Sequence, residues 1–406
     1  MNKTVLILML LLLSSVATYS QDGKEYLQYI ETSLKSGDCG KAQIWYDAYK
    51  NITGKTDASI ERRIKECEGG DIANDAEMGY KYMMGDGVPK DYSKALKLLT
   101  SAAEQGYADA QYNLGEMYYY GQGVAQNYTE ALNWYKKAAE QGNAEAQYSL
   151  GYMYDAGQGV AQNYTEALKW YKKAAEQGKA DAQYNLGFMY KNGRGVAQNY
   201  TEALEWYKKA AEQGYAIAQN SLAIMYYDGQ GVAQNYTEAL KWYKKAAEQG
   251  YANAQDNLGI IYYHGKVVAQ NYTEALNWFK KAAEQGKADA QYNLGFMYKN
   301  GQGVAQNYPE ALNWYKKAAE QGHATAQNSL GYMYDNGQGV AQNYTEALNW
   351  YKKAAEQGKA AAQYNLGVMY YNGQGVTQNN AEAIKWLKKA AEQGDEDAIK
   401  LLETLE

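Results

Sequence analysis

A chain of 406 residues has room for two or three ordinary domains, but its composition does not fit that arrangement. It contains 44 Tyr and 40 Gly against 3 Phe and 2 Pro, a bias that indicates a repeated sequence. The 40 basic and 46 acidic residues give a net charge of -6, and the basic residues are not gathered in one segment. Nucleic acid is therefore disfavoured as a partner, because phosphate binding needs clustered positive charge.

The first twenty residues differ from all that follows. Lys3 precedes an apolar run, Val5–Leu13, and a short stretch of small residues. This order is typical of a secretory signal peptide, which we place at residues 1–20 with cleavage after Ser20. The protein is therefore expected in the periplasm or outside a bacterial cell, and a short membrane anchor is the alternative. A lipid anchor would need a cysteine directly after the cleavage site, but the first cysteine is Cys39.

The next segment, residues 21–70, lies outside the repeat described below and is predicted to form an N-terminal helical cap with helices at 26–35, 41–50 and 59–67. Both cysteines, Cys39 and Cys67, fall here. Because an exported chain meets oxidising conditions, the sequence favours a disulfide between them, and two free thiols are the alternative. A metal site is disfavoured because neither histidine lies nearby.

The rest of the chain repeats with a period of 36 residues, as in the segment Tyr107–Gly142. Further copies begin at Asn143, Lys179, Tyr215, Tyr251, Lys287, His323 and Lys359, and a degenerate first copy spans 71–106. Residues 71–394 therefore hold nine units. Residues 395–406 begin in the same register and then become acidic, so we predict a C-terminal capping helix.

Each unit is predicted to fold as two helices. In the first, helix A, the apolar residues follow helical spacing at Ala110, Leu114, Met117 and Tyr118. Gly121 should end helix A. Helix B should begin at the N-cap Asn127, which matches the capping-box pattern with Glu130, and end at Gly142. The predicted buried stripe of helix B is Ala131, Trp134, Tyr135 and Ala138.

Three further positions refine this prediction. Pro309 replaces a threonine in the first turn of one helix B, where a missing N–H is tolerated. Gly115 lies inside helix A, where glycine costs about 1 kcal/mol relative to alanine, so its recurrence indicates a packing role. Val267 replaces a turn glycine in the sixth unit. Since valine is costly at positive φ, that turn should adopt a different backbone or be strained, and Val267→Gly should stabilise the protein.

One helix pair cannot cover its own apolar face, so neighbouring units must stack. The predicted fold class is all-α, a solenoid of tandem helix-turn-helix repeats. The pattern is similar to the Sel-1-like repeat, a relative of the tetratricopeptide repeat, in Ala110, Leu114–Gly115, Met117–Tyr118, the GQGV of 121–124, Ala131, Trp134 and the AAEQG of 138–142.

This resemblance implies a right-handed α/α superhelix whose A helices line a concave face, used as a scaffold or adaptor in protein assemblies. A related family of cysteine-rich secreted proteins, associated with penicillin-binding or hydrolase activity, has a disulfide in every repeat. This chain has two cysteines in all, which weakens any transfer of that activity.

The predicted ligand-binding residues occupy three helix-A positions that lie roughly opposite Ala110. They vary between units while the core repeats, and many are aromatic, which suits a bound peptide or a glycan stacked on tyrosines. Neutral drift of a solvated face is the alternative. The candidate residues are Tyr112, Glu116, Tyr119, Tyr148, Tyr152, Asp155, Tyr184, Phe188, Lys191, Tyr227, Tyr263, Tyr292, Phe296, Lys299, Tyr332, Asp335, Tyr364 and Tyr371. Lys136 and Lys137 are assigned to the opposite, solvated face.

No catalytic chemistry is predicted. His264 and His323 stand at non-equivalent positions and are interpreted as surface residues. The GQGV turn lacks the pattern of a phosphate loop, and the recurring Asn-Tyr-Thr is explained by helix capping, although it also matches a glycosylation sequon. No Ser-x-x-Lys or HExxH motif is present.

The predicted function is a non-catalytic scaffold, without cofactor or metal, that binds a protein, a peptide or an envelope glycan. The alternatives are a secreted hydrolase of β-lactams or cell wall and a luminal adaptor of protein quality control. The lack of a KDEL-like end disfavours the adaptor.

Overall fold

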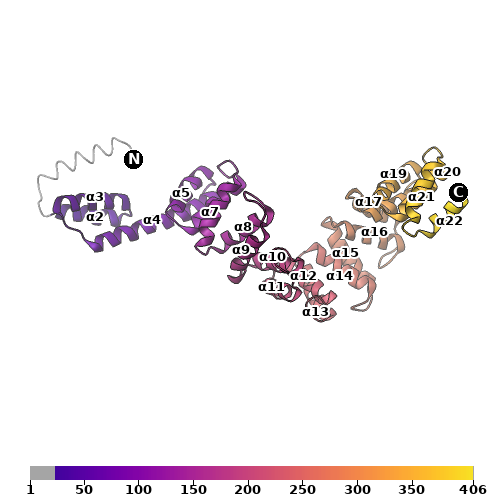
Figure 1. The fold of residues 1–406 in the computed structure, drawn as a ribbon, viewed down its shortest axis with the longest axis horizontal. Helices are drawn as coiled ribbons and strands as arrows, with labels where there is room; N and C mark the ends of the chain where they lie inside the picture. The colour runs from indigo at the N-terminus through magenta and orange to yellow at the C-terminus, as the bar shows by residue number, and fades with distance from the viewer. Residues whose placement is uncertain (1–22, 406) are drawn as a thin grey trace. The chain divides into compact units, whose positions relative to one another are not determined.

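The computed structural model describes residues 23–405, except for the side chains of Glu66 and residues 68–71. The predicted signal peptide and its cleavage site lie outside the described residues. Within them, every regular element is an α-helix (Figure 1). The predicted all-α class of tandem helix-turn-helix repeats is confirmed. None of the described helices is long and apolar enough to cross a membrane.

Three helices lead into the repeats: α2 (Lys24–Lys35), α3 (Cys39–Thr53) and α4 (Ala58–Met84). A disulfide joins Cys39 of α3 to Cys67 of α4, with Cα atoms 5.7 Å apart, as the sequence favoured. The prediction of a separate helix at residues 59–67 is wrong, because α4 continues unbroken into the first repeat. A glycine ends a helix when it adopts the left-handed conformation, and along α4 that happens at Gly85, with φ 79°.

The repeats follow as alternating helices. After α4, the A helices are α6 (Ala108–Tyr120), α8 (Ala144–Ala156), α10 (Ala180–Asn192), α12 (Ala216–Asp228), α14 (Ala252–His264), α16 (Ala288–Asn300), α18 (Ala324–Asn336) and α20 (Ala360–Asn372). The B helices are α5 (Tyr92–Glu104), α7 (Tyr128–Glu140), α9 (Tyr164–Glu176), α11 (Tyr200–Glu212), α13 (Tyr236–Glu248), α15 (Tyr272–Glu284), α17 (Tyr308–Glu320), α19 (Tyr344–Glu356) and α21 (Asn380–Ala391). The last helix, α22 (Glu396–Leu405), packs against α21 through Ala398 and Leu402.

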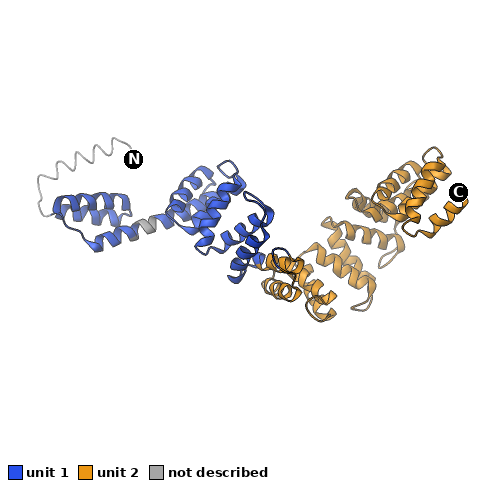
Figure 2. Ribbon diagram, viewed as in Figure 1, with its two compact units in different colours: residues 1–182, 194–196 blue, residues 183–193, 197–406 orange. Residues whose placement is uncertain are grey.

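The chain divides into two compact units (Figure 2). Unit 1 comprises Met1–Ala182 and Arg194–Val196, and unit 2 comprises Gln183–Gly193 and Ala197–Glu406.

The turn between helices A and B follows the predicted glycine and asparagine signals, with one difference. Gly121 ends α6 at φ 68°, and Asn127 Oδ1 accepts hydrogen bonds from the backbone N–H groups of Thr129 and Glu130. The backbone N–H of Asn127 donates to the Tyr118 carbonyl at 2.9 Å. The reciprocal half of the capping box is therefore replaced by a bond that ties helix B to the end of helix A.

Within a repeat, glycine lets the two helices approach closely. A Cβ atom on Gly115 would lie 2.6 Å from the Tyr135 ring, which is 1% exposed. The predicted packing role of Gly115 is confirmed.

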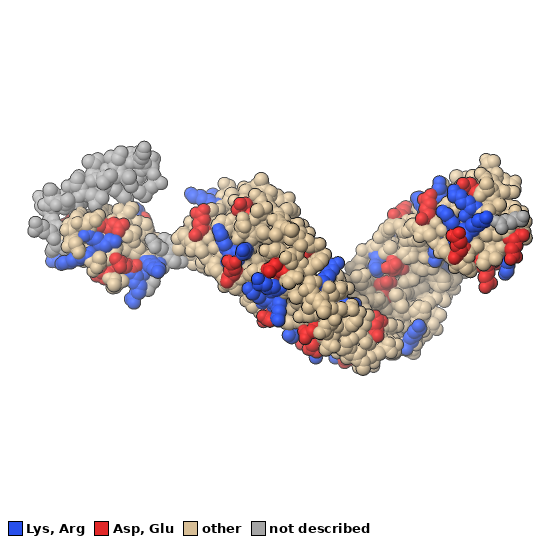
Figure 3. All heavy atoms as spheres, viewed as in Figure 1, with Lys and Arg blue, Asp and Glu red and all other residues tan. Residues whose placement is uncertain are grey.

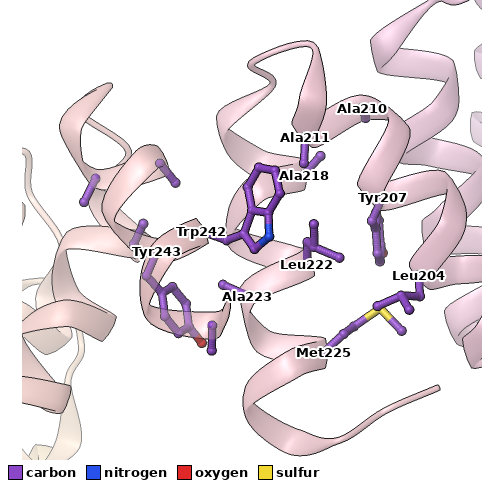
Figure 4. Packing of buried hydrophobic residues seen from close by; sticks show 14 of the residues in the cluster. Leu204, Tyr207, Ala210, Ala211, Ala218, Leu222, Ala223, Met225, Trp242 and Tyr243 are labelled. Carbon is purple, nitrogen blue, oxygen red and sulfur yellow. The ribbon is translucent and has the colours of Figure 1, made fainter. Parts of the chain in front are cut away.

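Between repeats, a tryptophan from each B helix after α5 closes the seam. Trp314 of α17, for example, packs into the apolar cluster formed by α15 and α16. Figure 4 shows the same arrangement at Trp242 of α13, which points toward Ala211 of the preceding B helix, α11, and Leu222 of α12.

Glutamine supplies a second contact between repeats, which sequence reasoning missed. Gln111 is 4% exposed, and its Nε2 donates to the carbonyl of Ala103 on the preceding B helix at 3.0 Å. Its Oε1 accepts from Gln141 Nε2 at 2.7 Å, so one buried amide links three helices. The recurrence of both glutamines in every full unit was the available signal.

The turn between helices A and B of the sixth repeat contains Val267 in place of a glycine. Among the described residues, no residue other than glycine has positive φ, so Val267 adopts a different backbone. The turn is also tighter: a Cβ on Gly265 would lie 2.9 Å from Gln270 N, against 3.2 Å for Gly121 and Gln126 N. Val267 itself packs against the neighbouring core. The stabilisation expected from Val267→Gly therefore no longer follows.

Candidate ligand-binding face

The predicted ligand-binding residues lie on the A helices, and most are half-buried. In unit 1 they lie on α6 and α8. In unit 2 they lie on the A helices α10, α12, α14, α16, α18 and α20. Tyr152 and Tyr332, which are 41% and 40% exposed, are the most accessible of the set. We call the surface formed by these helix-A positions the A-helix face.

The first of the three positions serves the core as much as the surface. The Tyr112 ring packs 5.8 Å from the buried Tyr135 ring of helix B, and the Tyr184 ring packs 5.6 Å from Tyr207. The same contact joins Tyr148 to Tyr171 and Tyr292 to Tyr315. These half-buried tyrosines therefore hold helix A to helix B.

The third position is anchored to the next repeat in two places. Tyr119 Oη donates to Gln158 Oε1 at 2.6 Å, and Tyr263 Oη donates to Gln302 Oε1 at 2.9 Å. In four other repeats this position carries a charged residue: Asp155, Lys191, Lys299 and Asp335. Lys299 Nζ lies 4.5 Å from the centre of the Tyr332 ring, a cation–π contact on the face itself.

Burial perturbs the charged residues of the face. Desolvation raises the pKa of the Asp155 and Asp335 carboxyls and lowers the pKa of the Lys299 amine. Each shift disfavours the charged form. A ligand that carries the opposite charge would therefore gain more here than at an open surface.

A pocket of about 270 Å³ opens on the A-helix face of unit 1. Its lining residues come from α6, α7 and α8, with Tyr135 as the floor: Glu116, Tyr119, Tyr120, Tyr135, Tyr148, Ser149 and Tyr152. Sequence reasoning named four of these residues. It missed Tyr120, Tyr135 and Ser149 because the pocket also uses neighbouring helix-A positions and a helix-B ring.

A second pocket, of about 220 Å³, lies on α14, α15 and α16 of unit 2. Its lining residues are Ile260, Tyr263, His264, Phe279, Tyr292, Asn293 and Phe296. These are the same seven repeat positions as in the first pocket, four repeats further along the chain. The two pockets differ in chemistry, because Glu116 and Tyr135 of the first correspond to Ile260 and Phe279 of the second.

A third opening, which lies in unit 2, has a mainly polar lining. It is lined by Asn220, Ile224, Asn253, Asp256, Asn257, Lys287 and Asp289. Asp256 is 6% exposed, and burial, with the Asp289 carboxylate, raises its pKa to about 6. Lys287 pairs with Asp289 at 2.8 Å.

Two sequence interpretations need correction. His323 is half-buried and caps α18, because its Nδ1 accepts from the Ala326 N–H at 3.0 Å; it also stacks on Tyr292. Lys137 is exposed as predicted, but its Nζ lies 3.7 Å from the centre of the Trp134 ring, so it also covers the seam between repeats. Lys136 is exposed.

The charges visible in Figure 3 are interspersed, with Lys and Arg beside Asp and Glu on the face in view. Among the described residues, no cluster of His, Cys, Asp and Glu could hold a metal ion.

Stacked helical hairpins with a constant core and a variable, aromatic A-helix face define a helical-repeat scaffold. The Sel1 repeat model matches residues 76–107, 108–143, 144–179, 180–215, 216–251, 252–287, 288–323, 324–359 and 360–395. The chain therefore belongs to the Sel1 repeat family.

Two solved structures support this assignment. A protective antigen of uropathogenic Escherichia coli strains, with an SLR fold, is 38% identical over 96% of this chain and 80% of its own, with a TM-score of 0.74. A Sel1 repeat protein from Oxalobacter formigenes is 34% identical over 77% of this chain and 90% of its own, with a TM-score of 0.60. No curated protein matches the chain.

Proposed function

We propose that this protein is a non-catalytic scaffold that binds a protein or peptide segment on the A-helix face. A glycan stacked on the tyrosines is the second ligand that we propose for this face. The observation that carries the proposal is the pair of pockets at the same seven repeat positions. Each unit therefore offers, at the same repeat positions of its A-helix face, a pocket that can receive a side chain of a ligand.

The variation between repeats supports the same proposal. The core positions are nearly constant, whereas the A-helix face ranges from Glu116 to Ile260 at one position. Aromatic residues contribute most to binding at many protein interfaces, and the A-helix face carries many half-buried tyrosines. We further propose that the protein acts after export, which the disulfide between Cys39 and Cys67 supports.

Site-specific photo-crosslinking tests the proposal. A photoreactive amino acid at Tyr152 or Tyr332 should yield covalent adducts from envelope extract, because both side chains project from the A-helix face. The same amino acid at Lys172 or Lys352, exposed on B helices, should yield none. Adducts confined to the lysine positions would refute the assignment of the face.

The crosslinked partner then permits an affinity measurement. Tyr332→Ala should weaken its binding at least tenfold, about 1.4 kcal/mol, with folding intact because the ring is already 40% exposed. Lys352→Ala is the matched control and should leave affinity unchanged.

A further inference from the structure

The unit 1 pocket differs from its counterpart in unit 2 by a carboxylate held within a group of tyrosines. Glu116 is half-buried, and its Oε1 accepts a hydrogen bond from Tyr135 Oη at 2.5 Å. The corresponding pair in unit 2, Ile260 and Phe279, has no polar side-chain atom. The seven positions are the same, so the carboxylate is a local addition to a shared pocket.

This carboxylate is oriented by hydrogen bonds and, among the described residues, forms no ion pair. Burial raises the pKa of Glu116, hydrogen bonds from the Tyr135 and Tyr112 hydroxyls oppose that rise, and the Glu145 carboxylate adds to it. Among the described residues, no Lys, Arg or His contributes to this balance. A partly desolvated charge without a counter-ion is costly, so a cation entering the pocket would relieve that cost.

The walls of the pocket suit a cation as well. Tyr119, Tyr120, Tyr148 and Tyr152 surround the opening, and the Tyr119 and Tyr120 rings meet edge to face at 4.9 Å. The faces of tyrosine rings attract ammonium and guanidinium groups. Lys179 already lies over the Tyr148 ring, with Nζ 5.7 Å from the ring centre, and pairs with Glu145.

The two A helices that frame the pocket carry charge of one sign. Helices α6 and α8 contain four carboxylates and no Lys, Arg or His; the carboxylates belong to Asp109, Glu116, Glu145 and Asp155. Other A helices, such as α10 and α16, contain a lysine. Because Glu145 is already paired with Lys179 at 2.8 Å, Glu116 is the carboxylate of this pocket that a positive group of a ligand can pair with.

We propose that the Glu116 pocket binds the cationic end of a lysine or arginine side chain of a partner protein. The charged group lies against the Glu116 carboxylate, and the aliphatic stem packs on the tyrosine rings. A volume of about 270 Å³ is below the range of pockets for whole drug-sized ligands and fits one side chain. The inference rests on the proposed function and names the partner chemistry for one of its two pockets.

The direct test uses a minimal probe. Binding of Nα-acetyl-lysine methylamide to the full chain is measured by ligand-observed NMR titration, with the norleucine analogue as the neutral control. The lysine probe should bind at least fivefold more tightly than the norleucine probe. Glu116→Gln, which keeps an acceptor for Tyr135, should remove this difference, and Lys136→Ala should preserve it.

A reciprocal variant tests the proposal without changing Glu116, so that a folding defect of Glu116→Gln cannot explain the result. Ile260→Glu combined with Phe279→Tyr places the same pair in the unit 2 pocket and should add a second site for the lysine probe. Equal affinity for the two probes in the unchanged protein, or a preference that survives Glu116→Gln with unfolding unchanged, would overturn the proposal. Spermidine binding far more tightly than the lysine probe would also overturn it, in favour of a free polyamine.

Failure of this inference can be separated from failure of the proposed function. If photo-crosslinking at Tyr152 still captures a partner while the lysine probe does not bind, the A-helix face functions without a cation pocket. If Tyr152 captures nothing and the lysine probe still binds through Glu116, the pocket is real and the scaffold proposal is wrong.

Discussion

The ring of Tyr135 occupies the space that a side chain at position 115 would need, since a Cβ on Gly115 would lie 2.6 Å from Cδ1 and Cε1 of that ring. One repeat tolerates alanine here: Ala223 lies beside Tyr243, which is 4% exposed against 1% for Tyr135 (Figure 4). That helix pair accommodates the extra methyl group with the tyrosine ring still buried.

We expect Gly115→Ala to lower the free energy of unfolding by about 1–2 kcal/mol, because the overpacking cost exceeds the helix-propensity gain. Chemical denaturation followed by circular dichroism measures the change. Asn133→Ala, at an exposed position of α7, is the control and should be near neutral. A more stable Gly115→Ala protein would show that α6 and α7 can separate at little cost.

The stability should depend on pH through Asp256. Its pKa is raised to about 6 in the folded state, so folding favours the protonated carboxyl. The resulting stability is present below the unfolded pKa of about 3.9 and is lost as the pH rises through about 6. Asp256→Asn should therefore stabilise the protein above pH 6, by an amount on the order of 3 kcal/mol, and much less at pH 3.

The chain contains its own precedent for that substitution. Asn220 and Asn328 hold the equivalent position and accept hydrogen bonds from Asn257 and Asn365 at 3.1 Å. The amide oxygen introduced by Asp256→Asn would offer the same acceptor to Asn293. Unfolding midpoints of both proteins measured from pH 3 to 8 test the prediction, and a constant difference across that range would contradict it.

The disulfide between Cys39 and Cys67 should stabilise the first three helices locally. The two residues are 28 positions apart, and on the chain-entropy model such a loop contributes about 3 kcal/mol. In Cys39→Ala with Cys67→Ala, amide exchange in α2 and α3 should accelerate while that in α14 to α20 stays the same. Thiol labelling of the unfolded, unreduced protein should find no free thiol, and two labelled thiols would refute the bond.

Val267→Gly should now destabilise the sixth repeat by about 1 kcal/mol, from lost burial and a more flexible unfolded chain. The reason is that Val267 packs on the core and does not have positive φ. The measurement is the unfolding midpoint, with Lys266→Gln as the control at the neighbouring, exposed position. A rise in stability would restore the original expectation of a strained turn.

The sequence by itself determined the repeat period, the two helices of each unit and their ends. These features depend on local chemistry that recurs many times: Gly121 at positive φ, Asn127 as a cap, and apolar residues at helical spacing. The packing role of Gly115 could be inferred for the same reason. The continuity of α4 could not be inferred, because the repeat register predicts the stop at Gly85 but does not show that a helix of the N-terminal segment runs into the first repeat.

Only the tertiary structure decided which helix-A residues form a pocket. Sequence spacing places Tyr112, Glu116 and Tyr119 on one stripe, but it does not show that the Tyr135 hydroxyl reaches Glu116 or that Tyr120 and Tyr152 close the opening. Those contacts join residues on three helices from two repeats. Their distances depend on how closely the helices pack, which the buried glycine, tyrosine and glutamine side chains set together.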